Sequence, residues 1–262
     1  MQSHCLRYIL YIHNTRNADP QYIINFINNY RDQFTISNLD DYLRNYDYDT
    51  LTNFFNGGYN YSDSAVLISN PSEMNLVIKD NETVYRYVPT DLKAIDGSII
   101  PYISSISGED TIYVKNDIIN PLKQMGEALS KENGEINGGL ILTSGYISYD
   151  KQRELYDSAL LKYGTNDVLK YSDYPGCSDS QLGYSVTFTI ADMDENEIKE
   201  SNQVKWLKDN AYKYGFIIRF PDGKEKITGK NYQPLTLRYV GNEEAKSIYE
   251  EASTLELFKS KD

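Results

Sequence analysis

Apolar and polar residues alternate along this chain with two different periods. Apolar residues recur every three or four positions in several stretches, a spacing typical of helices that pack by one face. These predicted helices cover residues 20–30, 38–55, 112–129, 149–163, 204–214 and 243–258. Period-two alternation or short apolar runs predict strands at residues 7–13, 139–143, 183–190, 216–220 and 235–240. Helices and strands mix without a regular βαβ order, which favours an α+β fold over a doubly wound sheet.

The pattern also divides the chain into two regions. Residues 59–73 are polar and rich in turn-forming residues, which predicts a linker. We therefore expect an accessory region over residues 1–73 and a main domain over residues 74–262. The chain contains 25 Tyr, which we interpret first as a compositional bias, with Tyr taking places in the core. An aromatic surface that binds carbohydrate or peptide, and an accessory region that acts as an interaction module, are the alternatives.

Charge and cysteine content exclude several classes of function. The 38 acidic and 26 basic residues give a net charge of −12, which argues against nucleic acid as a partner. No apolar run approaches the roughly 20 residues that cross a bilayer, so no membrane span is expected. The longest N-terminal apolar run, residues 8–12, is too short for a signal-peptide core. Two cysteines, Cys5 and Cys177, do not suggest a disulfide framework.

Four segments in order carry a family resemblance. They are SGYISYDKQ (residues 144–152), YPGCSDSQLGYSVTF (174–188), WLKDNAYKYGFIIRFPDGKEKITG (206–229) and YQPLTLRYVG (232–241). Together with an upstream segment at residues 76–92, they resemble the VanY-type D-alanyl-D-alanine carboxypeptidases. The resemblance implies the α+β fold that the Hedgehog signalling domain shares with zinc DD-peptidases. It also implies an extracytoplasmic location at the bacterial cell envelope.

The resemblance places the family's zinc chemistry on four positions of this chain. In the family, His and Asp of an S-x-H-x-x-G-x-A-x-D motif and His of an E-P-W-H motif hold zinc, and the Glu of E-P-W-H is the catalytic base. The corresponding residues here are Ser180, Thr187, Thr236 and Gln233. Hydroxyls are poor zinc ligands, and a neutral amide cannot accept a proton. We therefore expect no zinc and no catalytic residue; the chain's two histidines, His4 and His13, lie outside the matched segments.

The same resemblance identifies a candidate binding cleft. The family's SGYRSY segment carries an Arg that recognises the terminal carboxylate of the peptide, and Ile147 stands at that position. The candidate cleft residues are Ile147, Gln152, Ser178, Ser180 and Arg238. They predict an inactive pseudopeptidase that holds a peptidoglycan stem peptide or docks an envelope protein. A cleft that has filled in and binds nothing is the other interpretation.

An enzyme that works by a different route is the rival hypothesis. It would use Cys177 as a nucleophile, or a metal gathered by acidic residues. A cysteine nucleophile needs a nearby base or cation to lower its pKa, and the matched segments contain no His. The acidic run at residues 192–197 lacks the spacing of a calcium loop and is interpreted as a solvated helix start. The Lys-containing segment 224–230 is interpreted as a structural loop.

Overall fold

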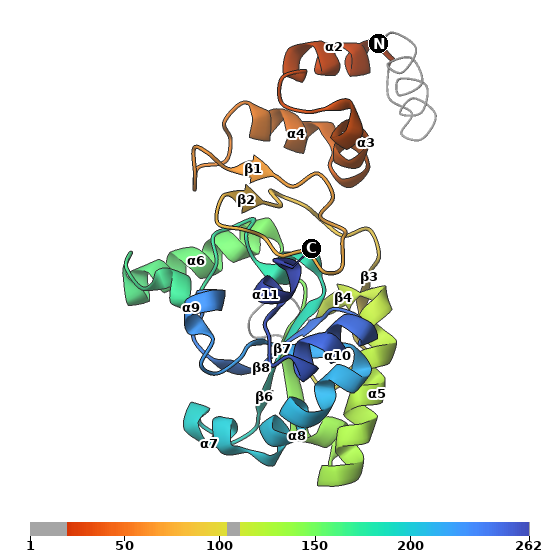
Figure 1. Cartoon of the computed structure of the whole chain (residues 1–262), viewed down its shortest axis with the longest axis vertical. Helices are drawn as coiled ribbons and strands as arrows, with labels where there is room; N and C mark the ends of the chain where they lie inside the picture. The colour runs from red at the N-terminus through yellow and green to blue at the C-terminus, as the bar shows by residue number, and fades with distance from the viewer. Residues whose placement is uncertain (1–19, 104–110, 262) are drawn as a thin grey trace.

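Three short helices begin the described part of the chain. The structure is a computed structural model that describes residues 20–103 and 111–261, so the strand expected at residues 7–13 lies outside it. The helices are α2 (Pro20–Tyr30), α3 (Ile36–Asn45) and α4 (Tyr48–Phe55) (Figure 1). The helix predicted at residues 38–55 is therefore two helices. The break lies at Asp47, whose side chain caps α4 by accepting a hydrogen bond from the Thr50 amide at 2.6 Å.

The polar stretch at residues 59–73 packs against the rest of the molecule and is not a free linker. Its strand β1 (Val66–Leu67) pairs in parallel with β2 (Glu82–Thr83). Tyr59 and Leu67 are buried, and the Tyr42 hydroxyl donates to the Leu67 carbonyl at 2.8 Å. One apolar core joins the N-terminal helices to the central sheet. The domain boundary expected at residue 73 remains a prediction.

A four-stranded antiparallel sheet forms the centre of the molecule. Its order is β5 (Leu140–Ser144), β6 (Ser185–Ile190), β8 (Gln233–Tyr239) and β7 (Phe216–Phe220). A smaller antiparallel pair joins β3 (Leu92–Ala94) to β4 (Tyr113–Lys115). The predicted helix at residues 112–129 was wrong at its start, where β4 precedes α5 (Asn116–Asn133). The predicted α+β fold is confirmed.

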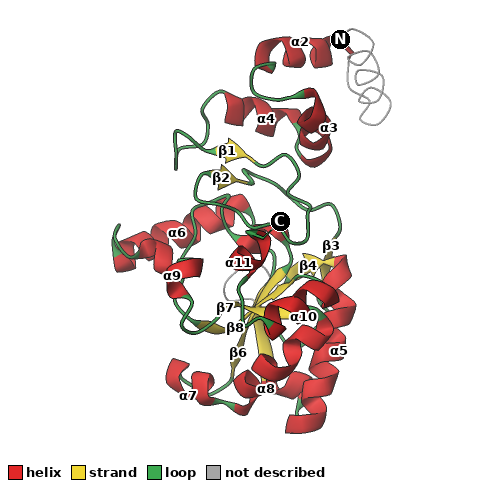
Figure 2. Cartoon of the chain, in the orientation of Figure 1, coloured by secondary structure: helices red, strands yellow, loops and turns green. Residues whose placement is uncertain are grey.

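The two faces of the central sheet differ in chemistry. Val186, Phe188 and Leu237 point into the apolar core, on the side of α5 and α8 (Asn202–Asn210). The intervening positions of β6 and β8 are polar and carry Ser185, Thr187, Thr236 and Arg238. Figure 2 shows α5 and α8 on one side of the strands. On the other side lie α6 (Tyr149–Tyr163), α9 (Glu225–Thr228) and α11 (Leu255–Lys259). Ala245 and Ile248 of α10 (Asn242–Glu250) pack with Ile217 of β7 and Leu255 of α11.

Local capping explains the remaining helix boundaries. The predicted helix at residues 243–258 is interrupted between α10 and α11, where Ala252 has a φ of 48° and Thr254 caps α11. Asp194 caps α7 (Glu195–Glu200), which agrees with the interpretation of the acidic run as a helix start. Within residues 20–103 and 111–261, no helix combines the length and apolarity needed to cross a membrane.

Candidate ligand-binding cleft

Three of the four positions expected at the zinc site meet on the polar face of the sheet. Thr187 of β6 lies directly opposite Thr236 of β8 in the strand register. Their Oγ1 atoms are 3.2 Å apart, and Thr236 Oγ1 donates to Gln233 Oε1 at 2.9 Å. A hydroxyl has one proton, so Thr187 must be the donor to Thr236. The result is a neutral hydrogen-bonded chain, Thr187 to Thr236 to Gln233.

The fourth position, Ser180, lies in a 3₁₀ turn beside Ile147. Ser178 caps this turn (Asp179–Leu182), its Oγ accepting from the Ser180 amide at 3.3 Å. The Ile147 amide donates to the Ser180 carbonyl at 3.2 Å, and the Ile147 side chain is only 6% exposed. Within the described residues, no hydrogen bond links the Ser180 side chain to the threonine pair. A backbone hydrogen bond thus links Ile147, at the family's Arg position, to Ser180, at the first zinc-ligand position.

These donors do not fit zinc. Structural and catalytic zinc sites use thiolate, imidazole and carboxylate ligands. Here the equivalent positions hold hydroxyls and an amide, and the hydroxyl protons of Thr187 and Thr236 are used within the Thr187–Thr236–Gln233 chain. Across the described ranges, no three His, Cys, Asp or Glu residues gather closely enough to hold a metal ion. His4 and His13 lie outside those ranges.

Gln152 and Lys230 hold the loop that precedes the 3₁₀ turn. Gln152 is buried in α6 and donates through Nε2 to the Asp173 carbonyl at 2.9 Å and to Ser172 Oγ at 3.1 Å. Lys230 Nζ lies 2.5 Å from Asp173 Oδ1 and donates to the Leu169 carbonyl at 2.6 Å. Gln152 was predicted to bind ligand, yet its amide nitrogen is used within the protein. Lys230 belongs to the segment interpreted as a structural loop, and its contacts agree with that interpretation.

Arg238 was also predicted as a cleft residue, and in the structure it has no exposed surface. Its Nη1 lies 3.4 Å from Asp179 Oδ2, and its Nη2 donates to the Met74 carbonyl at 2.8 Å. Arg219 pairs with the same Asp179 carboxylate and, at 2.6 Å, with Glu256 of α11. We call Arg219, Arg238, Asp179 and Glu256 the buried charge cluster. Burial alone would raise the pKa of Asp179, but Arg219 and Arg238 outweigh it and lower that pKa below its ordinary value.

Sequence reasoning missed three members of this cluster. Asp179, Arg219 and Glu256 come from a turn, an edge strand and the last helix, so no local spacing relates them. The alternating burial of β7 could have indicated one of them, because Arg219 falls on the same face as buried Ile217. The cluster has two positive and two negative side chains and is neutral as a whole.

Cys177 is not arranged as a nucleophile. Its Sγ lies 3.3 Å from the Tyr59 hydroxyl and donates to the Glu82 carbonyl at 3.5 Å. Burial raises the pKa of the thiol, so the neutral form dominates near neutral pH. Neither contact supplies a base, and the rival hypothesis therefore gains no support from this residue.

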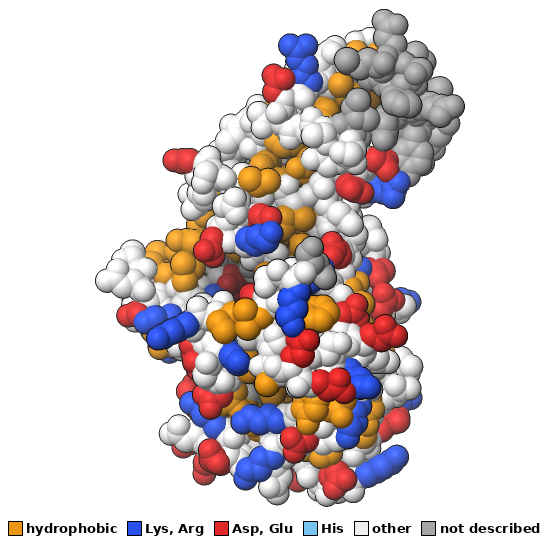
Figure 3. Space-filling view, in the orientation of Figure 1, with side chains coloured by type: hydrophobic (Ala, Val, Ile, Leu, Met, Phe, Trp, Pro, Cys, Tyr) orange, Lys and Arg blue, Asp and Glu red, His pale blue; other side chains and the backbone are white. Residues whose placement is uncertain are grey.

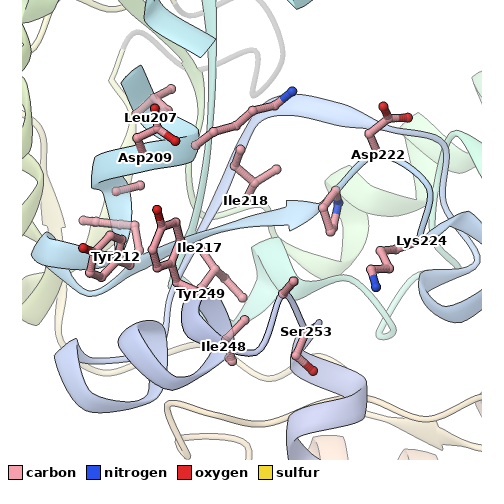
Figure 4. Close-up of a pocket in the computed structure, with 15 residues that line it drawn as sticks. Leu207, Asp209, Tyr212, Ile217, Ile218, Asp222, Lys224, Ile248, Tyr249 and Ser253 are labelled. Carbon is pink, nitrogen blue, oxygen red and sulfur yellow. The ribbon is translucent and has the colours of Figure 1, made fainter. Parts of the chain in front are cut away.

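A separate pocket lies along the edge strand β7 (Figure 4), and neither Thr187 nor Thr236 lines it. Its volume is about 390 Å³. Tyr212 and Tyr249 stack on each other there with ring centroids 4.0 Å apart, close to Ile217 and Ile248. None of the predicted cleft residues lines this pocket. On the molecular face in Figure 3, acidic and basic side chains are interspersed, without a large patch of one sign.

The fold is of the DD-peptidase-like class. Its antiparallel sheet has helices on both sides, and the polar face of the strands brings these motif positions together. The sequence model of the VanY family, D-alanyl-D-alanine carboxypeptidase, matches residues 111–242. The putative carboxypeptidase YodJ of Bacillus subtilis is 36% identical over 206 residues, covering 76% of this chain and 71% of that protein. The chain belongs to the VanY family of D-alanyl-D-alanine carboxypeptidases.

Other relatives and solved structures agree with this family. A D-alanyl-D-alanine carboxypeptidase of Enterococcus faecium is 30% identical over 136 residues, which cover 51% of this chain and 39% of that protein. The structure of the LdcB LD-carboxypeptidase, described for its peptidoglycan recognition, matches with a TM-score of 0.64 and 32% identity. That match covers 77% of this chain and 92% of LdcB. VanYB in complex with D-alanine-D-alanine shares the fold, with a TM-score of 0.57 at 24% identity over 71% of this chain and 97% of VanYB.

Proposed function

We propose that this VanY-family protein binds a peptidoglycan stem peptide at the bacterial cell envelope without hydrolysing it. The single observation that carries the proposal is the hydrogen-bonded chain Thr187–Thr236–Gln233 at the positions where the family holds zinc and its base. The ligand class follows from the relatives, which are carboxypeptidases, and from LdcB, whose structure concerns peptidoglycan recognition. The extracytoplasmic location is part of the same proposal.

The chemistry of the cleft supports binding more than hydrolysis. Zinc peptidases need a metal to activate water and a carboxylate to take its proton. Gln233 offers a neutral amide in place of that carboxylate, and its Oε1 already accepts a hydrogen bond from the Thr236 hydroxyl. Ser180, Thr187 and Gln233, which carry polar side chains, are nevertheless all partly accessible as residues. Polar side chains of this kind can hydrogen-bond a peptide backbone.

Metal content, peptide binding and hydrolysis, measured on the same tag-free protein, test the proposal. We expect less than about 0.1 zinc per chain by elemental analysis, heat of binding with N-acetyl-Lys-D-Ala-D-Ala, and no release of D-Ala. Stoichiometric zinc, or D-Ala release above the uncatalysed rate, would overturn the inactive assignment. Absence of binding at millimolar peptide, both as the free acid and as the C-terminal carboxamide, would overturn the binding role.

A matched variant checks that the substituted positions are the relevant ones. The quadruple substitution S180H/T187D/Q233E/T236H restores the family's ligand types on the same backbone. We expect this variant to take up about one zinc per chain, since imidazole and carboxylate are suitable ligands. A folded quadruple variant that fails to bind zinc would show that these positions do not form the metal site.

A further inference from the structure

Resting on the proposed function, we infer that the cleft recognises peptide that lacks a free α-carboxylate, whether amidated or continued into a longer chain. The first step is the side chain at the Arg position. Ile147 is apolar and buried there, with its amide bonded to the Ser180 carbonyl. A carboxylate removed from water needs charge-assisted hydrogen bonds to offset its desolvation. Ile147 supplies none.

The second step concerns the cations around the cleft. Arg219 and Arg238 are buried and balanced by Asp179 and Glu256. Lys230 is balanced by Asp173. Each of these three cations therefore already has a carboxylate within the protein. A free peptide carboxylate would add a negative charge to a neutral site, in a molecule whose net charge is −12.

The third step is the pattern of donors and acceptors. The hydroxyl protons of Thr187 and Thr236 are already donated in hydrogen bonds within the chain, so these hydroxyls can only accept further hydrogen bonds. Gln233 accepts through Oε1, which leaves its Nε2 group as a donor. Acceptors beside a donor complement an amide, which offers both N–H and C=O. A carboxylate offers acceptors only, so its oxygens would face the lone pairs of the threonines.

The test compares two peptides that differ only at the C-terminal group. N-acetyl-Lys-D-Ala-D-Ala is titrated into the full chain as the free acid and as the C-terminal carboxamide, at pH 7. We expect the carboxamide to bind about tenfold more tightly, the ratio that corresponds to roughly one hydrogen bond involving a charged group. Equal affinity, or tighter binding of the acid, would overturn this inference and leave the proposed function standing. If neither peptide binds, the proposed function itself fails.

Two variants at one position sharpen the result. Ile147→Arg restores a cation, so it should remove the preference for the carboxamide or reverse it. Ile147→Met keeps an uncharged side chain of similar size and should retain the preference. Circular dichroism of each variant checks that it is folded. A folded I147R protein that still prefers the carboxamide tenfold would show that charge at this position does not set the selectivity.

Discussion

Two adjacent cross-strand pairs on the same face of the sheet differ in burial and charge. Ser185 faces Arg238 across β6 and β8, and two residues along the strands Thr187 faces Thr236. The first pair includes a fully buried cation that belongs to the charge cluster, while the second is a neutral pair at the cleft. Removing one member of a buried ion pair leaves an uncompensated charge, whereas a neutral hydrogen bond contributes about 1 kcal/mol. We therefore expect the fold to tolerate new residues at Thr187 and Thr236 far more readily than in the buried charge cluster.

The largest effect is expected from Arg238→Met. This substitution removes a cation from beside Asp179 and the hydrogen bond to the Met74 carbonyl. We expect the free energy of unfolding, measured with urea, to fall by about 3–5 kcal/mol. Arg31→Met is the control, because the Arg31 side chain is 76% exposed, and it should change stability by less than about 0.5 kcal/mol. If both variants lost less than about 0.5 kcal/mol, the buried charge cluster would be no more sensitive to substitution than the exposed surface.

A pH-dependent effect is expected from Asp179→Asn. The folded-state pKa of Asp179 lies below its ordinary value because Arg219 and Arg238 outweigh the effect of burial. Its contribution to stability is therefore complete above the unfolded-state pKa of about 3.9 and is lost as the pH falls through the lower folded-state value. At pH 7 we expect D179N to be less stable than wild type by about 3 kcal/mol, the lower end of the range for breaking a buried ion pair.

Urea unfolding of both proteins at several pH values checks this prediction. The difference between them should stay constant from about pH 7 to pH 5 and shrink below about pH 4. A difference that grows as the pH falls would mean that the carboxylate is not stabilised by its two arginines.

The smallest effect is expected from Thr236→Val. The substitution keeps the side-chain shape but removes the hydrogen bonds to Thr187 and Gln233. We expect a loss of about 1 kcal/mol in the free energy of unfolding. Thr189→Val is the matched control on β6, because within the described structure its hydroxyl makes no hydrogen bond. A loss above about 3 kcal/mol for T236V would show that the cleft is as constrained as the cluster.

The sequence predicted elements best where local signals were strong. The bounds of α6 and β7 match the predicted ranges, because Ser148 caps α6, Gly164 follows it, and Gly215 precedes β7. The predictions merged helices where the chain carries internal caps, at Asp47 and Thr254, which are short polar signals inside otherwise helical spacing. The start of α5 was misplaced because the buried Ile112 and Val114 fit a strand as well as a helix.

In the candidate cleft, too, the sequence predicted some residues correctly as neighbours but could not predict roles that depend on contacts between distant segments. The family resemblance identified Thr187, Thr236 and Gln233, and the strand register brings them together. The roles of Gln152 and Arg238 could not be read from their positions, because both use their side chains on backbone carbonyls far along the chain. Which polar side chain faces a ligand and which supports the fold depends on packing between distant segments.

The contact between β2 and Gly176 has an evolutionary consequence. Gly176 has a φ of +85°, its carbonyl accepts from both Thr83 Oγ1 and the Val84 amide, and a Cβ there would lie 2.3 Å from Thr83 Oγ1. Position 176 is therefore restricted to glycine while β2 keeps its place. Gly176 lies two residues before Ser178, so only a short piece of backbone separates the β2 contact from the 3₁₀ turn that Ser178 caps. Among relatives that keep the β2 contact, we therefore expect glycine at position 176.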